Sequence, residues 1–344
     1  MSDRVIDRLG AEIWYDIITH DDGVSNIGGT TCGVIGSMGA GKTTILKEII
    51  SQSSYCFDKT NTSEKKIREG IIYIGRPLDT WLNLFDIGKE VRVFCYVSAP
   101  SYFCISKGDK LYSINEKLKP VLRFYTSPLS LIENLSEHGI NIIYGPPSFE
   151  ITKNIITILE RRIGQTPPKE GSPCDPALWW FDFISALVRI KKADAHYTLV
   201  VDEAHRLFPP SPSGAWWHLI QDLCESLVDL RKSNLSFVLA SHDTNMIDYR
   251  IIDRLNFFMW MRGSTPPSRI SMVQSSLSGR CARGQAILEE KGVRFGRGFS
   301  MRNKNTQPHI RVFNYELDKQ TIDALLVRNR MVIEKTITDE GVKV

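Results

Sequence analysis

One short segment, Gly36–Thr44, constrains the fold of this chain more than any other. It fits the pattern Gly-x-x-x-x-Gly-Lys-Ser/Thr at every fixed position. The glycines allow backbone N–H groups to turn inward around phosphates, and the N-terminus of a following helix also favours negative charge. The segment follows an apolar run, Thr31–Ile35, and leads into helical spacing over Lys42–Ser51. Because strand, loop and helix come in the order that a phosphate-binding loop needs, a chance match in a Gly-rich turn is disfavoured.

Two side chains of this P-loop predict a site for ATP and Mg²⁺. Lys42 would reach the β- and γ-phosphates, and the hydroxyl of Thr43 would hold the metal. The backbone of the whole loop would contact the nucleotide. The candidate nucleotide-binding residues are therefore Gly36, Ser37, Met38, Gly39, Ala40, Gly41, Lys42, Thr43 and Thr44.

A second motif consists of two carboxylates behind an apolar run. Tyr197–Val201 is typical of a buried strand, and Asp202 and Glu203 come directly after it. In P-loop enzymes an Asp at such a strand end holds Mg²⁺, and a nearby polar residue orients the attacking water. We interpret Asp202 as a metal ligand and Glu203 as a catalytic residue, which distinguishes a hydrolase from a nucleotide-binding switch. The alternative is a solvated acidic strand end, which is common for a lone Asp-Glu pair.

Two further residues are candidates for contact with the γ-phosphate. His242 follows the next strand, Ser236–Ala240, where many such ATPases sense that phosphate. Its alternative role is that of a hydrogen-bonded loop histidine. Arg231 lies at the end of a long helix and could reach a neighbouring subunit as an arginine finger. For Arg231 the alternative is an arginine on a solvated helix end.

The order of apolar patterns predicts an α/β fold with a largely parallel sheet covered by helices on both faces. Strands are expected at Ile71–Ile74, Val91–Val97, Ile140–Tyr144, Tyr197–Val201, Phe237–Ala240 and Leu255–Met261, with a hairpin over Cys104–Ser113. One helix is expected to start at Pro128 and end at Gly139, and a second is expected to be capped by Ser148. A third is expected to start at Asp175-Pro176, and a fourth to follow the stripe from Trp216 to Leu230.

Composition limits the class of protein. The 344 residues are 42% hydrophobic and 24% charged, as in ordinary soluble proteins, and the net charge of +4 does not by itself indicate nucleic acid. The seven scattered cysteines argue against a disulfide framework or a zinc site and favour a reducing compartment. The charged N-terminus does not look like a signal peptide, and the uncharged run Val93–Ser106 is too short to span a bilayer. We therefore expect a cytoplasmic protein without a membrane span.

With these residues in place, the chain resembles the HerA/FtsK class of P-loop motors, which are hexameric, RecA-like ATPases that move double-stranded DNA and include viral genome-packaging enzymes. The resemblance covers roughly two-thirds of the chain. It rests on Gly36–Thr44, Leu199–Pro209, Asp229–Lys232 leading into Phe237–His242, Ile247-Asp248 and Gly284–Ile287. It implies a homo-hexamer acting on double-stranded DNA and, for a virus, a capsid or portal partner and a location in the host cytoplasm or virion. The class usually has Gln where this chain has His242.

The resemblance also implies a domain layout. A lead-in over residues 1–30 precedes a RecA-like P-loop ATPase domain over 31–315, and a tail follows over 316–344. Within the domain, residues 51–139 match no named family and are expected to form an insertion or accessory segment.

Three alternatives compete with a DNA motor. The same stretches resemble Zot-like ATPases of filamentous-phage assembly, which would act through protein contacts. A monomeric nucleotide switch that hydrolyses slowly is another. Asp202-Glu-Ala-His205 also spells the box of a superfamily-2 helicase, but such helicases need a second RecA-like domain after that box. The interval before Gly279–Gly284 holds only one helix and two strands, so we reject the helicase.

A basic stretch near the end of the domain is the candidate DNA contact. Between Arg280 and Arg311 there are eight cations against two acids, Glu289 and Glu290. Such an excess would suit a phosphate backbone if the cations share a face. The alternative is a solubilising face on edge strands. The cations are Arg280, Arg283, Lys291, Arg294, Arg297, Arg302, Lys304 and Arg311.

Overall fold

A computed structural model describes most of the predicted core. The described residues are 29–53, 70–75, 84, 90–98, 104–107, 110–113, 118–163, 168–191, 195–229, 234–271, 273–281, 285–290 and 310–314. Residues 1–28 and the predicted tail, 316–344, lie outside them.

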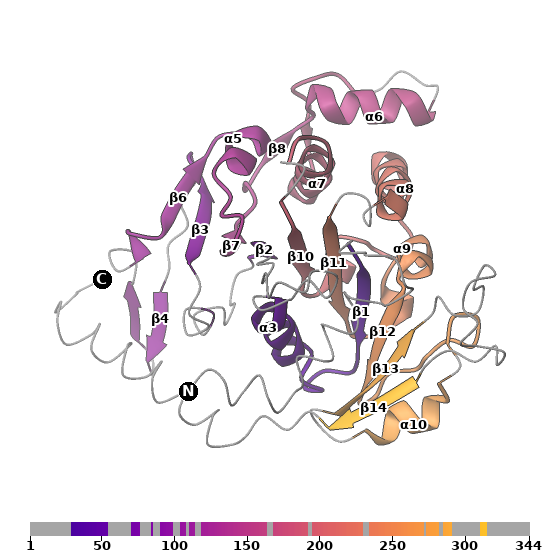
Figure 1. The fold of residues 1–344 in the computed structure, drawn as a ribbon. Coiled ribbons are helices and arrows are strands. Elements are labelled where there is room, and N and C mark those ends of the chain that lie inside the picture. Colours follow the sequence, from indigo (N-terminus) through magenta and orange to yellow (C-terminus); the bar gives the residue numbers. More distant parts are fainter. Residues whose placement is uncertain are drawn as a thin grey trace, which may run out of the picture.

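One sheet of ten strands organises this part of the chain (Figure 1). Eight neighbouring strands, from β12 to β6, run parallel, and β13 and β14 extend the β12 edge in antiparallel fashion. This confirms the predicted α/β class with a largely parallel sheet. In spatial order the strands are β14 (Ile310–Asn314), β13 (Gln285–Glu290), β12 (Phe257–Met261), β1 (Thr31–Ile35), β11 (Leu235–Ser241), β10 (Tyr197–Val201), β2 (Gly70–Ile74), β7 (Ile140–Ile143), β3 (Val91–Tyr96) and β6 (Leu122–Tyr125).

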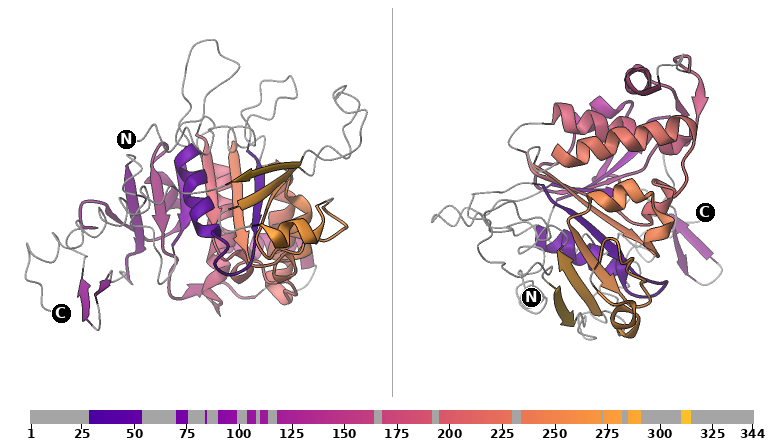
Figure 2. Two further views of the ribbon diagram at one scale, coloured as in Figure 1. Left: turned by 90° about the horizontal axis from the view of Figure 1, so that it is seen from below. Right: turned by 90° about the vertical axis from the view of Figure 1, so that its right-hand side faces the viewer.

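Helices cover both faces of this sheet, as the continuous apolar strands predict. On one face lie α6 (Lys153–Ile163), α7 (Trp179–Ile190), α8 (Gly214–Asp229) and α9 (Tyr249–Arg254). On the other face lies α3 (Lys42–Ser53), which is in front of the strands when the molecule is seen from below (Figure 2). Alternate residues of β10 serve the two cores: Leu199 and Val201 pack toward α7 and α8, and Val200 packs toward α3.

Two predicted helix boundaries were wrong. Ser127 does cap α5 (Pro128–Glu133), but that helix ends at Glu133 and not at Gly139. The chain turns after Asn134, and Asn141 holds this turn, because its Oδ1 accepts a hydrogen bond from the backbone N–H of Ser136 at 2.7 Å.

Ser148 does not cap a helix. The residues after it form a short strand, β8 (Phe149–Glu150), which pairs with β9 (Pro173–Cys174). The helix α6 starts later, and the hydroxyl of Thr152 accepts a hydrogen bond from the Ile155 N–H. A pairing partner far away in sequence therefore overrode the local capping signal.

Strands from the segment 51–139 belong to the main sheet. β2 lies between β10 and β7, and β3 lies between β7 and β6. The predicted hairpin is present as β4 (Cys104–Lys107) and β5 (Lys110–Ser113), which form a separate two-stranded sheet. The division of the chain into domains stays a prediction. Among the described helices, none has both the length and the apolar character that crossing a membrane requires.

Candidate nucleotide-binding site

The sheet order brings the predicted motifs to one edge. β11 lies between β1 and β10, with Ile35 opposite Ser241 and Val201 opposite Leu239. The three strands are parallel, so their carboxyl ends lie side by side, which is where open α/β sheets bind ligands. The P-loop follows β1, the Asp202-Glu203 pair follows β10, and His242 follows β11.

The P-loop is held in a turn that only glycine adopts without strain at two positions. Gly39 and Gly41 have φ values of 73° and 103°. Gly36 is required for space, because a Cβ there would lie 2.7 Å from the Cβ of Met261. Its backbone N–H donates to the carbonyl of Ser241 at 3.1 Å, which ties the loop to β11.

A second tie joins the P-loop to the turn after β12. Both the N–H and the hydroxyl of Ser37 donate to the carbonyl of Arg262, at 2.9 and 3.0 Å. Gly263 follows with φ of 74°, and a Cβ on it would lie 2.6 Å from the Ser37 hydroxyl oxygen. The loop is thus shaped from two sides before any phosphate binds.

The ammonium of Lys42 has three acceptors within the site. Its Nζ lies 2.9 Å from the Gly36 carbonyl, 3.2 Å from the Ser37 carbonyl and 2.9 Å from Nδ1 of His242. The side chain is buried, and this burial lowers the pKa of Lys42, while the charges of Glu203 and Asp202 act in the opposite direction. A charged ammonium has three hydrogens to donate and no lone pair. His242 must therefore accept through Nδ1 and carry its hydrogen on Nε2.

Thr43 and Asp202 are the predicted metal ligands, and they lie in contact. The Thr43 hydroxyl donates to Oδ2 of Asp202 at 2.9 Å, and Oδ1 of the same carboxylate accepts from the Glu203 N–H at 2.9 Å. A hydroxyl and a carboxylate side by side are oxygen donors of the kind that suits Mg²⁺. Within the described part of the chain, no group of three His, Cys, Asp or Glu could hold a metal. An ion bound here would thus complete its shell with phosphate and water, as Mg²⁺ commonly does.

Glu203 has an unusual backbone and two histidine neighbours. Its φ and ψ are 54° and 48°, in the left-handed region that residues other than glycine rarely adopt. Its Oε2 lies 3.2 Å from Nε2 of His242 and 3.4 Å from Nδ1 of His205. In the first contact, the Nε2–H that Lys42 imposes on His242 lies against the Glu203 carboxylate. In the sequence, His205 was named only as a letter of the Asp-Glu-Ala-His box. Its contact with Glu203 was missed, because no rule of sequence spacing predicts it.

Other predicted residues are not placed with the site. Arg231 lies outside the described residues, as do most cations of the basic stretch. Arg280 ends α10 (Ser275–Arg280) and is exposed. In the P-loop, Met38 is 85% exposed at the tip.

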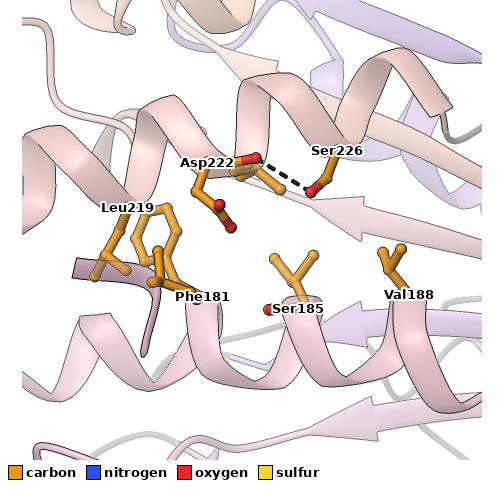
Figure 3. Close-up of a pocket in the computed structure, with 9 residues that line it drawn as sticks. Phe181, Ser185, Val188, Leu219, Asp222 and Ser226 are labelled. Carbon is orange, nitrogen blue, oxygen red and sulfur yellow. Dashed lines mark hydrogen bonds between the residues drawn. The ribbon is translucent and has the colours of Figure 1, made fainter. Parts of the chain in front are cut away.

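A small cleft lies elsewhere, between α6, α7 and α8 (Figure 3). Figure 3 shows Phe181 and Ser185 of α7 facing Leu219 and Asp222 of α8. No P-loop residue lines it, and its walls are mainly apolar. We assign it to helix packing and place the chemistry at the carboxyl edge of the sheet. Its lining residues are Ile158, Phe181, Ile184, Ser185, Val188, Leu219, Asp222, Leu223 and Ser226.

The sheet order and the P-loop settle the fold. It is a RecA-like P-loop NTPase fold. No protein-family model and no curated protein matches the chain.

Solved structures similar to the chain include both kinds of protein that its sequence resembles. The genome packaging NTPase B204 of Sulfolobus turreted icosahedral virus 2, in complex with AMP, has 10% identity and a TM-score of 0.43 over 84% of this chain and 98% of that one. The N-terminal domain of zonular occludens toxin from Neisseria meningitidis has 11% identity and a TM-score of 0.32 over 86% of this chain and 98% of that one. VirB4 of Thermoanaerobacter pseudethanolicus has 11% identity and a TM-score of 0.45 over 86% of this chain and 92% of that one. Likenesses this low carry no conclusion about activity.

Proposed function

We propose that the protein is a Mg²⁺-dependent ATPase that couples ATP hydrolysis to the movement of double-stranded DNA, as in viral genome packaging. The observation that carries the ATPase proposal is the convergence of Lys42, Thr43, Asp202, Glu203 and His242 at one edge of the sheet. A phosphate-binding loop, an oxygen pair for the metal and a carboxylate for water are the parts that hydrolysis of ATP requires.

The geometry supports the following division of work. P-loop N–H groups and Lys42 would bind the β- and γ-phosphates, and Thr43 and Asp202 would hold Mg²⁺, which would supply charge neutralisation at those phosphates. Glu203 orients a water and accepts its proton as the water oxygen bonds to the γ-phosphorus and the bond to the β–γ bridging oxygen breaks. His242 would meet the γ-phosphate once Lys42 turns from it to the nucleotide.

DNA as the moved substrate is proposed from charge and resemblance. The stretch Arg280–Arg311 has eight cations against two acids, and neutralising phosphates is the main source of sequence-independent DNA affinity. Replacing Arg294, Arg297 and Arg302 by Ala should weaken binding to any duplex and flatten its log–log salt dependence, by about 0.9 for each phosphate that is no longer neutralised. An unchanged slope in the folded triple variant would remove this stretch from the DNA surface.

The hexamer and its arginine finger are proposed in the same way. If Arg231 acts on a neighbouring subunit, mixing Arg231→Ala with Lys42→Ala subunits should restore some hydrolysis, because some mixed interfaces have an intact P-loop facing an intact arginine. Absence of recovery in verified mixed oligomers would argue against Arg231.

One experiment tests the whole proposal: the ATPase rate with and without duplex DNA, measured together with the particle mass. Stimulation by DNA in a multi-subunit particle is the expected result. Hydrolysis in an oligomer that ignores DNA would favour a Zot-like ATPase that drives virion assembly through protein contacts. A slow monomer would favour a nucleotide switch.

A further inference from the structure

One turn contacts both the nucleotide site and the helix at which the basic stretch begins. It comprises residues 262–265, which directly follow β12, and is called the β12 turn below. Toward the site, the carbonyl of Arg262 accepts from both the N–H and the hydroxyl of Ser37, at 2.9 and 3.0 Å. Gly263 lies so close to Ser37 that a Cβ there would be 2.6 Å from its hydroxyl oxygen. A shift of the β12 turn would therefore move the P-loop.

The β12 turn is also tied to the loop that bears His242. The hydroxyl of Thr265 donates to Oδ2 of Asp243, the residue after His242, at 3.0 Å. The other carboxylate oxygen, Oδ1, accepts from the N–H of Asn245 at 2.9 Å, and the Asp243 carbonyl accepts from the hydroxyl of Ser241 at 3.1 Å. Asp243 thus joins the end of β11 to the β12 turn, and the candidate γ-phosphate sensor lies between these ties.

A third contact joins the β12 turn to α10 (Ser275–Arg280) through buried groups. The hydroxyl of Ser278 lies 2.8 Å from the carbonyl of Ser264, with the Ser275 carbonyl as a second acceptor at 3.1 Å. Ser264 in turn donates from its N–H and its hydroxyl to the carbonyl of Met261, at 3.0 and 2.7 Å. Ser264 and Ser278 are 2% and 0% exposed, so water does not compete for these bonds.

The helix α10 ends at the first cation of the basic stretch. Arg280 is its last residue and is exposed, two positions after the buried Ser278. On the other side, Pro266 and Pro267 follow the β12 turn directly and restrict its backbone, because each proline ring fixes φ. The β12 turn therefore has little freedom to absorb a displacement of α10.

We propose that the β12 turn couples α10 to the nucleotide site. DNA bound at Arg280 and the cations after it shifts α10, and the bond between Ser278 and Ser264 passes the shift to the P-loop and to the His242 loop. This rests on the proposed function and adds to it the route by which DNA stimulates hydrolysis. Coupling between two sites is reciprocal, so a nucleotide in the P-loop must also act on α10. That direction can be measured without DNA.

Hydrogen exchange tests the coupling from the nucleotide side, in the full-length protein. The N–H groups of Leu277 and Cys281 donate to the carbonyls of Gln274 and Ser278, at 2.9 and 3.2 Å, so their exchange reports opening of α10. A non-hydrolysable ATP analogue should slow this exchange by about fivefold or more in the wild type, as for an ordinary coupling between sites. Ser278→Ala should lose the effect. Ser276→Ala should keep it and is the matched control, because Ser276 is an exposed serine on the same helix.

The ATPase rate at saturating duplex DNA tests the coupling from the other side. Ser278→Ala should keep the basal rate and the Kd for DNA within about twofold of wild type, while the stimulation by DNA falls by about two- to tenfold, the factor of one hydrogen bond. Thr265→Val removes the bond to Asp243 at an exposed position and should show a similar fall. Thr265→Ser keeps the hydroxyl and should retain the stimulation.

Several results would overturn the coupling. One is an analogue that binds the wild type and leaves the exchange of α10 unchanged. Others are equal behaviour of Ser278→Ala and Ser276→Ala, or of Thr265→Val and Thr265→Ser. A Ser278→Ala variant whose lower stimulation comes with lost DNA affinity would also overturn it, since α10 would then only form the binding surface.

Two results in the wild type separate the coupling from the proposed function. A protein that binds no ATP analogue would overturn both the ATPase function and the coupling. A protein in which the analogue slows exchange in α10, while duplex DNA leaves the ATPase rate unchanged, would overturn DNA as the stimulating partner and support the coupling. Analogue affinity is the check on folding in each variant, and the exposed Thr265 pair decides if Ser278→Ala does not fold.

Discussion

Nζ of Lys42 lies 2.9 Å from Nδ1 of His242, so the P-loop cation and the candidate γ-phosphate sensor are bound to each other. The next contact joins His242 to Glu203 at 3.2 Å. Phosphate binding at Lys42 would therefore be transmitted to the catalytic carboxylate through one imidazole. Whether a phosphate is present and whether the water is activated become linked events.

His242 should tolerate glutamine better than leucine. A Gln amide can accept from Lys42 through its oxygen and present its N–H to Glu203, in place of Nδ1 and Nε2 of the imidazole, whereas Leu can do neither. We expect His242→Gln to retain kcat within about tenfold and His242→Leu to lose about 100-fold or more, as when a reacting group is misplaced. Equal rates in the two variants would remove His242 from this linkage.

Lys42→Ala should abolish hydrolysis. No other described cation contacts the carbonyls of Gly36 and Ser37, so the charge on the β- and γ-phosphates would not be replaced. The measurement is ATP turnover in a preparation purified free of contaminating ATPases. Wild-type turnover in this variant would contradict the P-loop assignment.

Glu203→Gln should separate binding from turnover. The substitution removes the carboxylate that accepts the proton from water but leaves Thr43 and Asp202, which are in contact independently of the Glu203 side chain. Analogue affinity should stay near that of wild type, while kcat falls by about 100-fold or more, which is the usual loss when one acid–base group is removed. A variant that binds no nucleotide, or one that turns over normally, would show that Glu203 has another role.

Gly263→Ala should loosen the P-loop without altering Lys42, Thr43 or Asp202. Ala at φ of 74° is strained by about 1–2 kcal/mol, and its Cβ would press on Ser37 at 2.6–2.7 Å. The melting temperature and the affinity for an ATP analogue should both fall. Gly279→Ala is the matched control, since nothing lies within 4 Å of its added Cβ and its φ is not in the left-handed range. Equal behaviour of the two variants would contradict this view of the loop.

Asp182→Asn should stabilise the protein in a pH-dependent way. Burial raises the pKa of Asp182 above its ordinary value, against opposing hydrogen bonds from Asn154 and Thr152. The folded state thus holds the Asp182 proton more tightly than the unfolded state does, and stability falls as pH rises through this range. Asn cannot ionise, so its advantage in melting temperature should be larger at pH 7 than at pH 4. The Glu160→Gln variant, at an exposed position within α6, controls for the loss of one negative charge, and an advantage independent of pH would contradict the explanation.

The parts of the site that sequence could predict are those encoded over a few neighbouring residues. The strand limits Thr31–Ile35 and Tyr197–Val201 agree with the structure, because a short apolar run is followed at once by a motif. The convergence of the motifs was also predictable, since parallel strands end at a common edge.

The features that sequence missed depend on contacts between distant segments. Ser148 has the chemistry of a cap, yet pairing between β8 and β9 decided the structure there. The contact of His205 with Glu203 depends on a left-handed backbone at a residue type that rarely adopts it. The roles of Arg231 and of the basic stretch stay predictions, because Arg231 and most of those cations lie outside the described residues.

The left-handed backbone of Glu203 implies a trade-off between durability and reactivity at one position. Glycine would adopt φ of 54° without the roughly 1–2 kcal/mol that a side chain costs there. A selection for heat resistance alone should therefore recover glycine at position 203, in a protein that lasts longer and no longer hydrolyses ATP. A selection that also demands turnover should keep the glutamate and find its stabilising changes elsewhere.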